Sequence, residues 1–533
     1  MGVPAYLCIM FVRKKQNKSG KVSVQVVQKD RMHRQQVVKT IGCSGDATEI
    51  EVLVSEGRAY IERCKGLTIP GLEGCEDKID AFVSSLGNSQ VQVIGPELVF
   101  GRLYDRIGYN AIPSEMFRHM VICRLFSPGS KLKTVDYLER YLHVTYDVSR
   151  IYRFLDSLCV RKGGRDDDGP KGSRTDYKHL VEQITFDHTK KVVGGDIAVC
   201  FYDMTTLYWE AEDEDDLRRC GFSKDGKHSC PQIFLGLLVA AGGNPIGYEI
   251  YEGNISEGKT IIPVVKALAG RFGFTKPVVV ADAGLLSKAN VASLADEGYG
   301  FILGARPKSE SAAVKERILS LDMQYGDIRE LEKDGGLRLV LSRTEKRARK
   351  DAHNRKRGLD RLQKKVGSGS LTKQHINNRG YNKYLRMDGE VKISIDMERY
   401  EADAAWDGIK GYVTNTELSC EEVIGSYGEL WRIERAFRFN KFDLAVRPIY
   451  HRLRNRIEGH ICICFTSYTI LLELERLLKA AKSDLTVYRA QELTRNMYAI
   501  SYTHEKSKMT KKVVLGMDEE QEKLCQIINN PEF

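Results

Sequence analysis

Short runs of hydrophobic residues that stop at polar or turn-forming residues predict buried strands along the middle of the chain. One run, Ile-Ala-Val-Cys-Phe-Tyr, ends at Asp203, and a second, Pro-Val-Val-Val-Ala, ends at Asp282. Between them, two apolar stretches, Ile233 to Ala241 and Ile246 to Tyr251, are separated by Gly-Gly-Asn-Pro, which indicates a hairpin. The stretch from Thr260 to Phe272 is expected to form a helix. The pattern therefore predicts the order strand, hairpin, helix, strand.

This order is that of a ribonuclease H-like fold, so we expect an α/β catalytic core of this type. A carboxylate directly after a buried strand points out of the carboxyl edge of an open sheet, where such sheets keep their sites. We therefore expect Asp203 and Asp282 to lie at one edge. Taken singly, each aspartate could instead cap a turn.

A third acidic residue, Glu434, lies far downstream in the segment YGELWRIERAFRFNK. Ser419 and Glu422 fit a capping box, which predicts that a helix begins near Cys420 and continues through Glu434.

One face of that predicted helix is polar and aromatic. Tyr427, Glu434 and Lys441 are seven residues apart, so they drift by only about 20° per step around the axis. Trp431 and Arg438 lie one turn to either side of Glu434 and share its face. The alternative is an amphipathic helix whose charged face is solvated.

The roughly 150 residues between Asp282 and Glu434 exceed what one crossover helix needs. They contain two strand-like stretches, LRLVLSR and EVKISIDMERYEA, on either side of the run from Arg343 to Lys365, which has 11 basic and 3 acidic residues. We interpret this segment as a β-rich insertion domain with a projecting basic helix. Its DNA-contact candidates are Arg347, Lys350, Arg355 and Lys356; the alternative is again a solvated face.

The patterns divide the chain into six parts. They are an N-terminal β-rich module (1–90), a helical module with a linker (91–190), the first part of the catalytic core (191–304), the β-rich insertion with its basic helix (305–418), the second part of the core (419–482) and a C-terminal region (483–533). The helical module contains the amphipathic segment VSRIYRFLDSL with two arginines. Its basic edges suit DNA contact, although packing helices would give a similar pattern.

Composition narrows the class of protein without identifying it. The 533 residues require several domains, and the net charge of +10 is a mild basic bias that is compatible with nucleic acid. Thirteen cysteines contain no Cys-x-x-Cys pair, so we expect free thiols and no zinc ribbon. Because neither a secretion signal nor a membrane span is indicated, we expect a cytoplasmic protein with no membrane partner.

The three carboxylates suit a pair of divalent metal ions that cut or rejoin phosphodiesters. Paired carboxylates also serve glycosidases, but a glycosidase would not explain the basic helix. Oxygen-only ligands favour magnesium. We therefore expect Asp203, Asp282 and Glu434 to be both the catalytic residues and the metal ligands.

The motifs YDMTTLYWE, VVVADAGLLS and YGELWRIERAFRFNKFDLAVRPIYH resemble those of the DDE transposases of bacterial insertion sequences, in the insertion-sequence-four group. The resemblance runs from about Tyr141 to Tyr468. The group's signature is Tyr, two residues, Arg, three residues, the catalytic Glu, six residues and Lys, and Tyr427, Glu434 and Lys441 match it. Leu430 occupies the arginine position, for which Arg438 is a hypothetical substitute.

The resemblance implies cut-and-paste transposition by a homodimer, which assembles on the terminal inverted repeats of the element and then joins target DNA. Two Mg²⁺ ions, for which Mn²⁺ can substitute, would support strand hydrolysis followed by attack of the new 3′-hydroxyl. Tyr427, Arg438 and Lys441 would contact DNA phosphates, and Trp431 would stack on a displaced base. The protein would then work in the cytoplasm, associated with the nucleoid. Two alternatives remain: a nuclease of the same fold without strand transfer, and a DNA-binding protein without catalysis.

Overall fold

The structure is a computed structural model of two compact units, residues 1–88 and 89–533. It describes residues 10–17, 20–29, 34–64, 83–84, 86–87, 90–159, 176–211, 213–223, 226–273, 276–369, 371–377, 380–388, 392–438, 449–503 and 509–531. The two units are described separately.

The N-terminal unit is an antiparallel sheet with one helix. Its sheet has the order β1-β2-β3, formed by β1 (Met10–Gln16), β2 (Val22–Lys29) and β3 (Gln35–Ser44). The strands confirm the β-rich character predicted for this region, and the inward residues Val24 and Val26 of β2 are fully buried. The helix α1 (Ala47–Cys64), which the sequence analysis did not predict, contacts all three strands.

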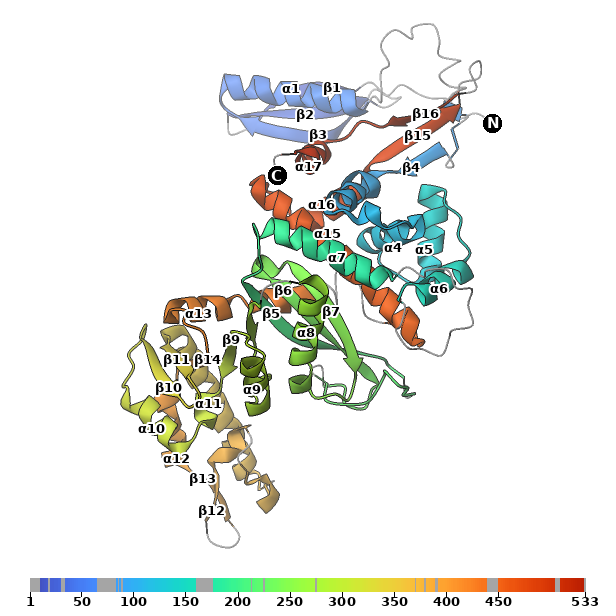
Figure 1. Ribbon diagram of the computed structural model, residues 1–533. Helices are drawn as coiled ribbons and strands as arrows, with labels where there is room; N and C mark the ends of the chain where they lie inside the picture. Colours follow the sequence, from blue (N-terminus) through green and yellow to red (C-terminus); the bar gives the residue numbers. More distant parts are fainter. Residues whose placement is uncertain are drawn as a thin grey trace, which may run out of the picture. The chain divides into compact units, whose positions relative to one another are not determined.

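The second unit is built on an eight-stranded mixed sheet with the order β10-β11-β14-β9-β8-β5-β6-β7 (Figure 1). Strands β5 to β7 form an antiparallel meander, and β5, β8 and β9 are parallel neighbours. The predicted hairpin and the helix after it are confirmed as β6, β7 and α8. The bounds are β5 (Val199–Tyr208), β6 (Gln232–Ala240), β7 (Pro245–Glu252), β8 (Val278–Ala281), β9 (Phe301–Ala305), β10 (Ile328–Lys333), β11 (Leu337–Arg343), β14 (Ile409–Thr414) and α8 (Ile261–Phe272).

Helices cover both faces of this sheet, and the alternation along β5 shows which face each residue joins. Phe201 and Leu207 pack in the core that includes residues of α13 to α15, whereas Cys200, Tyr202 and Met204 pack in the core that includes α8. The period of two places Asp203 on the face of Phe201. The covering helices are α9 (Lys288–Asp296) and α10 (Ala312–Ser320) beside α8, with α13 (Cys420–Gly428), α14 (Trp431–Arg438) and α15 (Arg454–Ala480) opposite.

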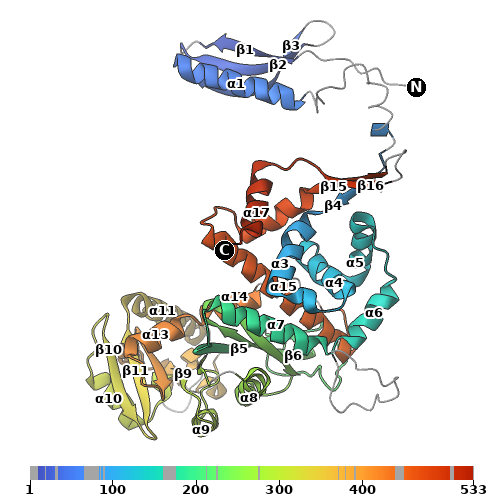
Figure 2. The same ribbon diagram turned by 45° about the horizontal axis from the view of Figure 1, so that its top comes forward.

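A helical module packs around the long buried helix α15, which contacts α4, α6 and α7 (Figure 2). Its elements are α3 (Arg102–Ile107), α4 (Glu115–Phe126), α5 (Lys131–Tyr137), α6 (Val148–Ser157), α7 (Tyr177–Val192), α16 (Val487–Leu493) and α17 (Glu519–Asn529), with a three-stranded sheet of β4 (Val91–Val93), β15 (Tyr498–Thr503) and β16 (Thr510–Val514). Although α15 is apolar in its middle, none of the described helices is long and apolar enough to cross a membrane. The cysteines whose side chains the structure describes are free thiols: Cys43, Cys123, Cys159, Cys200, Cys220, Cys230, Cys420, Cys462, Cys464 and Cys525.

The segment predicted as an insertion domain does not form a sheet of its own for most of its length. Strands β10, β11 and β14 extend the central sheet from β9. Beyond them lie the basic helix α11 (Glu345–Gly367), α12 (Met397–Ala402) and the two-stranded β12 (Leu385–Asp388) and β13 (Lys392–Ile395), which share a small core around Leu362 and Tyr384. A separate insertion domain is therefore not confirmed.

A buried carboxylate joins α15 to α7. Glu473 is only 3% exposed and accepts hydrogen bonds from Arg476, at 2.7 Å, and from His188 on α7, at 3.2 Å. Burial alone would raise the pKa of Glu473, but these bonds outweigh it and lower the pKa from 4.5 to about 2. The stabilisation is thus complete above pH 4.5 and is lost as the pH falls towards 2.

We predict that Glu473→Gln lowers the melting temperature at pH 7, because it removes a buried charged acceptor, at a cost of roughly 1–3 kcal/mol. The deficit relative to the parent protein should shrink as the pH falls from 5 towards 2–3, where the parent loses the same interaction. Calorimetry at a series of pH values measures this, with Glu316→Gln, at an exposed position on α10, as the control. A deficit that stays constant with pH would contradict it.

Candidate active site

The two aspartates follow paired residues on adjacent parallel strands. In the register of β5 and β8, Tyr202 pairs with Ala281, and the next residues along each strand are Asp203 and Asp282. The prediction that both strands end at an aspartate is right for β8 but wrong for β5. Strand β5 continues to Tyr208 because its far half pairs with β6 after the pairing with β8 has ended. Asp203 therefore lies within a strand, at the point where the parallel pairing stops.

The predicted single helix around Glu434 is two helices. The capping box is confirmed: the Ser419 hydroxyl accepts from the Glu422 backbone N–H at 3.2 Å, the Glu422 carboxylate accepts from the Ser419 N–H at 2.8 Å, and α13 begins at Cys420. However, α13 ends at Gly428. The next backbone hydrogen bonds join residues three apart, as from the Leu430 N–H to the Tyr427 carbonyl, instead of the four of an α-helix. Glycine is a poor helix former, and a tightened turn of this kind is common at a helix end.

All three acidic residues line one cavity of about 820 Å³. Asp203 and Asp282 reach it from the sheet and Glu434 from α14, so the break in the helix does not remove Glu434 from the site. The residues around them that bear on the chemistry are Arg347, Lys410, Tyr427, Leu430 and Trp431. The rest of the wall is formed by Met204, Thr205, Ala283, Gly304, Ala305, Gly411, Gly428, Ile433 and Phe437. The structure thus gathers the three predicted carboxylates.

Tyr427 ties α13 to the second aspartate. Its hydroxyl donates a hydrogen bond to Asp282 Oδ1 at 2.9 Å, and the side chain is only 8% exposed. Burial raises the pKa of the Tyr427 hydroxyl, and the Asp282 carboxylate raises this pKa further. Gly304 on β9 lies directly against the Tyr427 hydroxyl, where any Cβ would collide with it. Tyr427 was predicted to contact DNA phosphate; in the structure its hydroxyl is held by Asp282.

Lys410 on β14 is a cavity residue that sequence reasoning missed. Its ammonium lies 4.3 Å from the centre of the Tyr427 ring and 5.3 Å from that of Tyr412. Burial and the positive charge of Arg347 lower the pKa of Lys410, while Asp282 acts in the opposite direction. The only sequence signal is a lysine within the strand pattern IKGYVT, which does not reveal the neighbouring carboxylate.

The residues on either side of Glu434 on α14 line two different cavities. Trp431 lines the carboxylate cavity and is 49% exposed, so it is not a buried anchor of the helix. Arg438 lines a different cavity, with Glu475, Lys479 and Tyr488, because one further turn moves it along the helix axis by about 6 Å and around it by about 40°. Leu430 lies in the carboxylate cavity, and Lys441 falls outside the described residues.

The predicted basic helix is confirmed as α11, but its four candidate residues have different surroundings. Arg347 reaches the carboxylate cavity and pairs with Asp351 at 3.5 Å. Arg355 is largely buried, and its guanidinium is taken up by Asp407 in the loop before β14. Lys350 and Lys356 are exposed. The helix therefore offers Arg347, Lys350 and Lys356 to a ligand, whereas Arg355 fastens it to the protein.

The donor chemistry of the cavity fits a hard divalent cation, since three carboxylates offer oxygen ligands only. Their placement fits less closely, because no three acidic, histidine or cysteine side chains of the described residues are grouped tightly enough to hold one ion. Asp203 and Asp282 are brought together by the sheet. Glu434 is exposed and lies on the short helix α14. For the three carboxylates to hold one ion, Glu434 would have to move closer to the two aspartates.

Three solved structures are similar to this chain at low identity. The piggyBac transposase synaptic complex with hairpin DNA is 10% identical with a TM-score of 0.37, over 75% of this chain and 76% of that one. The Drosophila P element transposase strand transfer complex is 11% identical with a TM-score of 0.21, over 72% and 91%. The Mos1 mariner paired end complex with Mn is 12% identical with a TM-score of 0.14, over 46% and 72%. These TM-scores lie below 0.5 and do not by themselves establish a common fold.

No curated protein sequence matches the chain. A family model described as the transposase DDE domain matches residues 195–470, which is more than half of the 533 residues. The match begins before β5 and ends within α15, so it includes Asp203, Asp282 and Glu434 together with the strands and helices that carry them. The chain therefore belongs to the transposase DDE domain family.

Proposed function

We propose that this transposase cuts DNA at the ends of an insertion sequence and joins the cut strand to a target, with Asp203, Asp282 and Glu434 as its catalytic residues. The observation that carries the proposal is the single cavity lined by all three carboxylates, two of which follow a register pair of parallel strands. The strand order β7-β6-β5-β8-β9 supports a ribonuclease H-like core. The motifs support a place in the insertion-sequence-four group of bacterial elements.

The three carboxylates would hold Mg²⁺, or Mn²⁺ in its place. When bound, a pair of such ions activates the attacking oxygen and stabilises the leaving oxygen of a phosphodiester. The protein's own groups orient the site. Tyr427 fixes the rotamer of Asp282 by donating to one carboxylate oxygen, which leaves the other oxygen to the ligand. Gly304 leaves room for that hydroxyl.

Lys410 and Arg347 place positive charge beside the carboxylates, on the cavity wall that a scissile phosphate would meet. Charged groups held in a partly dehydrated cavity stabilise developing negative charge better than the same groups in water. Trp431 exposes half of its indole in the same cavity and can stack on an unpaired base. Lys350 and Lys356 would meet the DNA backbone outside the cavity.

The complete reaction also needs two DNA ends. We propose that a homodimer binds both terminal inverted repeats before it engages the target, in the nucleoid of a bacterial cell. A nuclease that cuts without joining is the second candidate function, since the same cavity would serve hydrolysis alone. Joining of a pre-cut end to a target plasmid separates the two: joined product supports transposition, and cleavage without joining supports the nuclease.

We predict that Asp203→Asn, Asp282→Asn and Glu434→Gln each reduce cleavage by at least about 100-fold, because each removes a charged oxygen donor while keeping the shape of the side chain. The measurement is Mg²⁺-dependent nicking of a supercoiled plasmid that carries the gene with its flanking DNA. DNA binding and melting temperature should remain close to those of the parent protein.

The matched control is Asp360→Asn, an exposed acidic residue on α11 that does not line the cavity. It should cleave at nearly the parental rate. Cleavage at the parental rate by any of the three active-site variants would show that the assignment of that residue is wrong.

We predict that Trp431→Ala slows the step after the first nick more than the nick itself. A stacked base is worth about 1–3 kcal/mol, so the later step should slow roughly tenfold or more. Because the indole is half exposed, the melting temperature should change little. Time courses that resolve nicked and fully cut DNA measure both steps. Equal slowing of both steps, or a large loss of thermal stability, would contradict the stacking role.

A further inference from the structure

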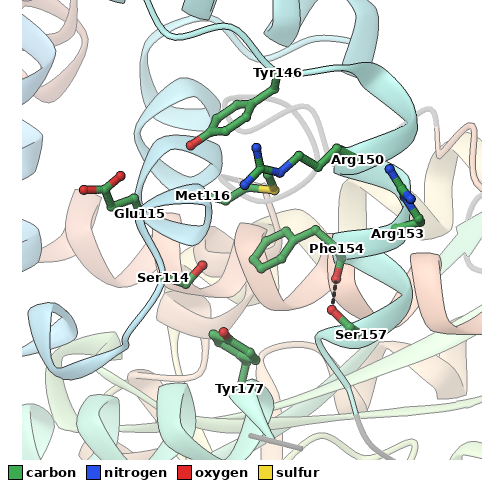
Figure 3. A pocket seen from close by; sticks show the side chains of 9 residues that line it. All are labelled: Ser114, Glu115, Met116, Tyr146, Arg150, Arg153, Phe154, Ser157 and Tyr177. Carbon is green, nitrogen blue, oxygen red and sulfur yellow. Dashed lines mark hydrogen bonds between the residues drawn. The ribbon is translucent and has the colours of Figure 1, made fainter. Parts of the chain in front are cut away.

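A second, open pocket of about 530 Å³ lies in the helical module, apart from the carboxylate residues (Figure 3). It is formed where α6 faces the N-terminal ends of α4 and α7. The side chains that line it are Ser114, Glu115, Met116, Tyr146, Arg150, Arg153, Phe154, Ser157 and Tyr177. None of them belongs to the proposed catalytic site, so the pocket calls for a separate explanation.

Two arginines of this pocket have no acidic partner within the part of the chain that the structure describes. Arg150 and Arg153 are both exposed, and neither guanidinium forms an ion pair or a hydrogen bond there. Other arginines of the module are paired: Arg118 with Asp105 at 2.6 Å, Arg140 with Asp136 at 2.6 Å and Arg456 with Asp156 at 2.8 Å. Arg150 and Arg153 differ from these three arginines, although Arg102 on α3 likewise has no ion pair among the described residues.

The spacing of these arginines places them on one face of α6. Residues three apart on a helix are neighbours, and like charges in that relation repel each other. An anion between the two guanidinium groups would replace this repulsion with two charge-assisted hydrogen-bonding interactions. The arrangement therefore favours a ligand with negatively charged oxygen atoms, such as a phosphate group.

The N-terminal end of α4 adds positive potential to the same pocket, whereas the N-terminal end of α7 is capped by the Asp176 carboxylate, which accepts from the His179 N–H. Ser114 caps α4 and Tyr177 is the first residue of α7, and both line the pocket. Free backbone N–H groups and the helix dipole favour an anion at such an end. Glu115 is the one acidic residue of the lining, and Figure 3 shows its carboxylate directed away from both guanidinium groups.

Aromatic side chains hold the pocket's shape. The Arg150 guanidinium lies 5.3 Å from the centre of the Tyr146 ring, which limits its freedom without neutralising its charge. Phe154 and Tyr177 meet edge to face with ring centres 6.0 Å apart. These rings form a partly apolar wall beside the charged groups, which suits the deoxyribose next to a backbone phosphate.

We propose that this pocket binds a backbone phosphate of duplex DNA, with Arg150 and Arg153 as its ligands. The proposal rests on the DNA substrate of the proposed function and adds a sequence-independent anchoring site away from the cut. Phosphate contacts fix the position and register of a protein on DNA but do not read its sequence. The pocket would hold the duplex while the carboxylate cavity acts on another part of it.

The test is the salt dependence of DNA binding by the full chain, measured by fluorescence anisotropy in EDTA so that no cleavage occurs. The probe is a 30-base-pair duplex of arbitrary sequence, titrated at KCl concentrations between about 50 and 250 mM. Each lost phosphate contact reduces the magnitude of the slope of log affinity against log salt by about 0.9. The double variant R150Q/R153Q should therefore have a slope smaller in magnitude by roughly 0.9–1.8 and should bind DNA more weakly.

The matched control is R140Q/R489Q, which removes two arginine charges that already pair with Asp136 and Glu520. Its slope should stay within about 0.3 of the parental slope. A second variant, R150K/R153K, keeps the charge but not the planar fork; it should keep the parental slope and bind more weakly. Because both arginines are exposed and form no ion pair within the described part of the chain, melting temperatures should match the parent.

An unchanged slope for R150Q/R153Q, or an equal loss in the control, would overturn the proposal, as would a parent protein that does not bind the duplex. If R150Q/R153Q does not fold, the lysine variant decides: parental affinity would overturn the proposal, and weaker binding at the parental slope supports it. Because DNA binding is measured without cleavage, the result for the pocket can be interpreted even if the proposed cleavage and joining are not observed. If the protein cleaves DNA but R150Q/R153Q leaves the salt slope unchanged, the phosphate-binding proposal is wrong and the proposed function still stands.

Discussion

The parallel pairing of β5 with β8 is the constraint on which the active site depends. Two parallel neighbours cannot be joined by a tight turn, so the chain between them must make a crossover, here the β6–β7 hairpin followed by α8. The crossover brings two segments almost eighty residues apart into register, with Asp203 and Asp282 each one residue beyond the last pair. A shift of this register by one residue would turn Asp203 to the other face of the sheet.

The remaining parts of the site are attached to this frame by specific contacts. The hydrogen bond from Tyr427 to Asp282 joins α13 to the end of β8, and α14 continues from that point to present Glu434. The close approach of Gly304 to the Tyr427 hydroxyl shows how little space the arrangement leaves. Because Tyr427 donates to one oxygen of Asp282, the tyrosine would orient this carboxylate in the proposed metal site, in the way that outer-sphere partners orient metal ligands.

The sequence carried enough information to predict the acidic residues and the order of the core elements. Apolar runs that end at Asp203 and Asp282, and a capping box before Glu434, are local signals, and each corresponds to a local structural feature. The break at Gly428 was not predicted, because seven-residue spacing assumes an unbroken helix. A single glycine costs only about 1 kcal/mol in a helix, so the pattern alone does not decide its effect.

Contacts between distant segments were the part that the sequence could not supply. Arg355 looked like one more exposed charge in a basic run, yet it is engaged by Asp407, which lies 52 residues further along the chain. Lys410 gave no signal at all, since its importance comes from Tyr427 and Asp282, which reach it only in the folded protein. The run of basic residues predicted the helix α11, but not which of its charges would already be paired.

The central claim is that Asp203, Asp282 and Glu434 act as one metal site although the three are not tightly grouped in this structure. Binding of Mn²⁺ to the full chain with a duplex DNA, followed by electron paramagnetic resonance of the free ion, tests it most directly. The account predicts that Glu434→Gln weakens Mn²⁺ binding at least about tenfold, as Asp203→Asn and Asp282→Asn do. Parental Mn²⁺ affinity in the Glu434→Gln protein would contradict it, because the glutamate would then lie outside the metal site.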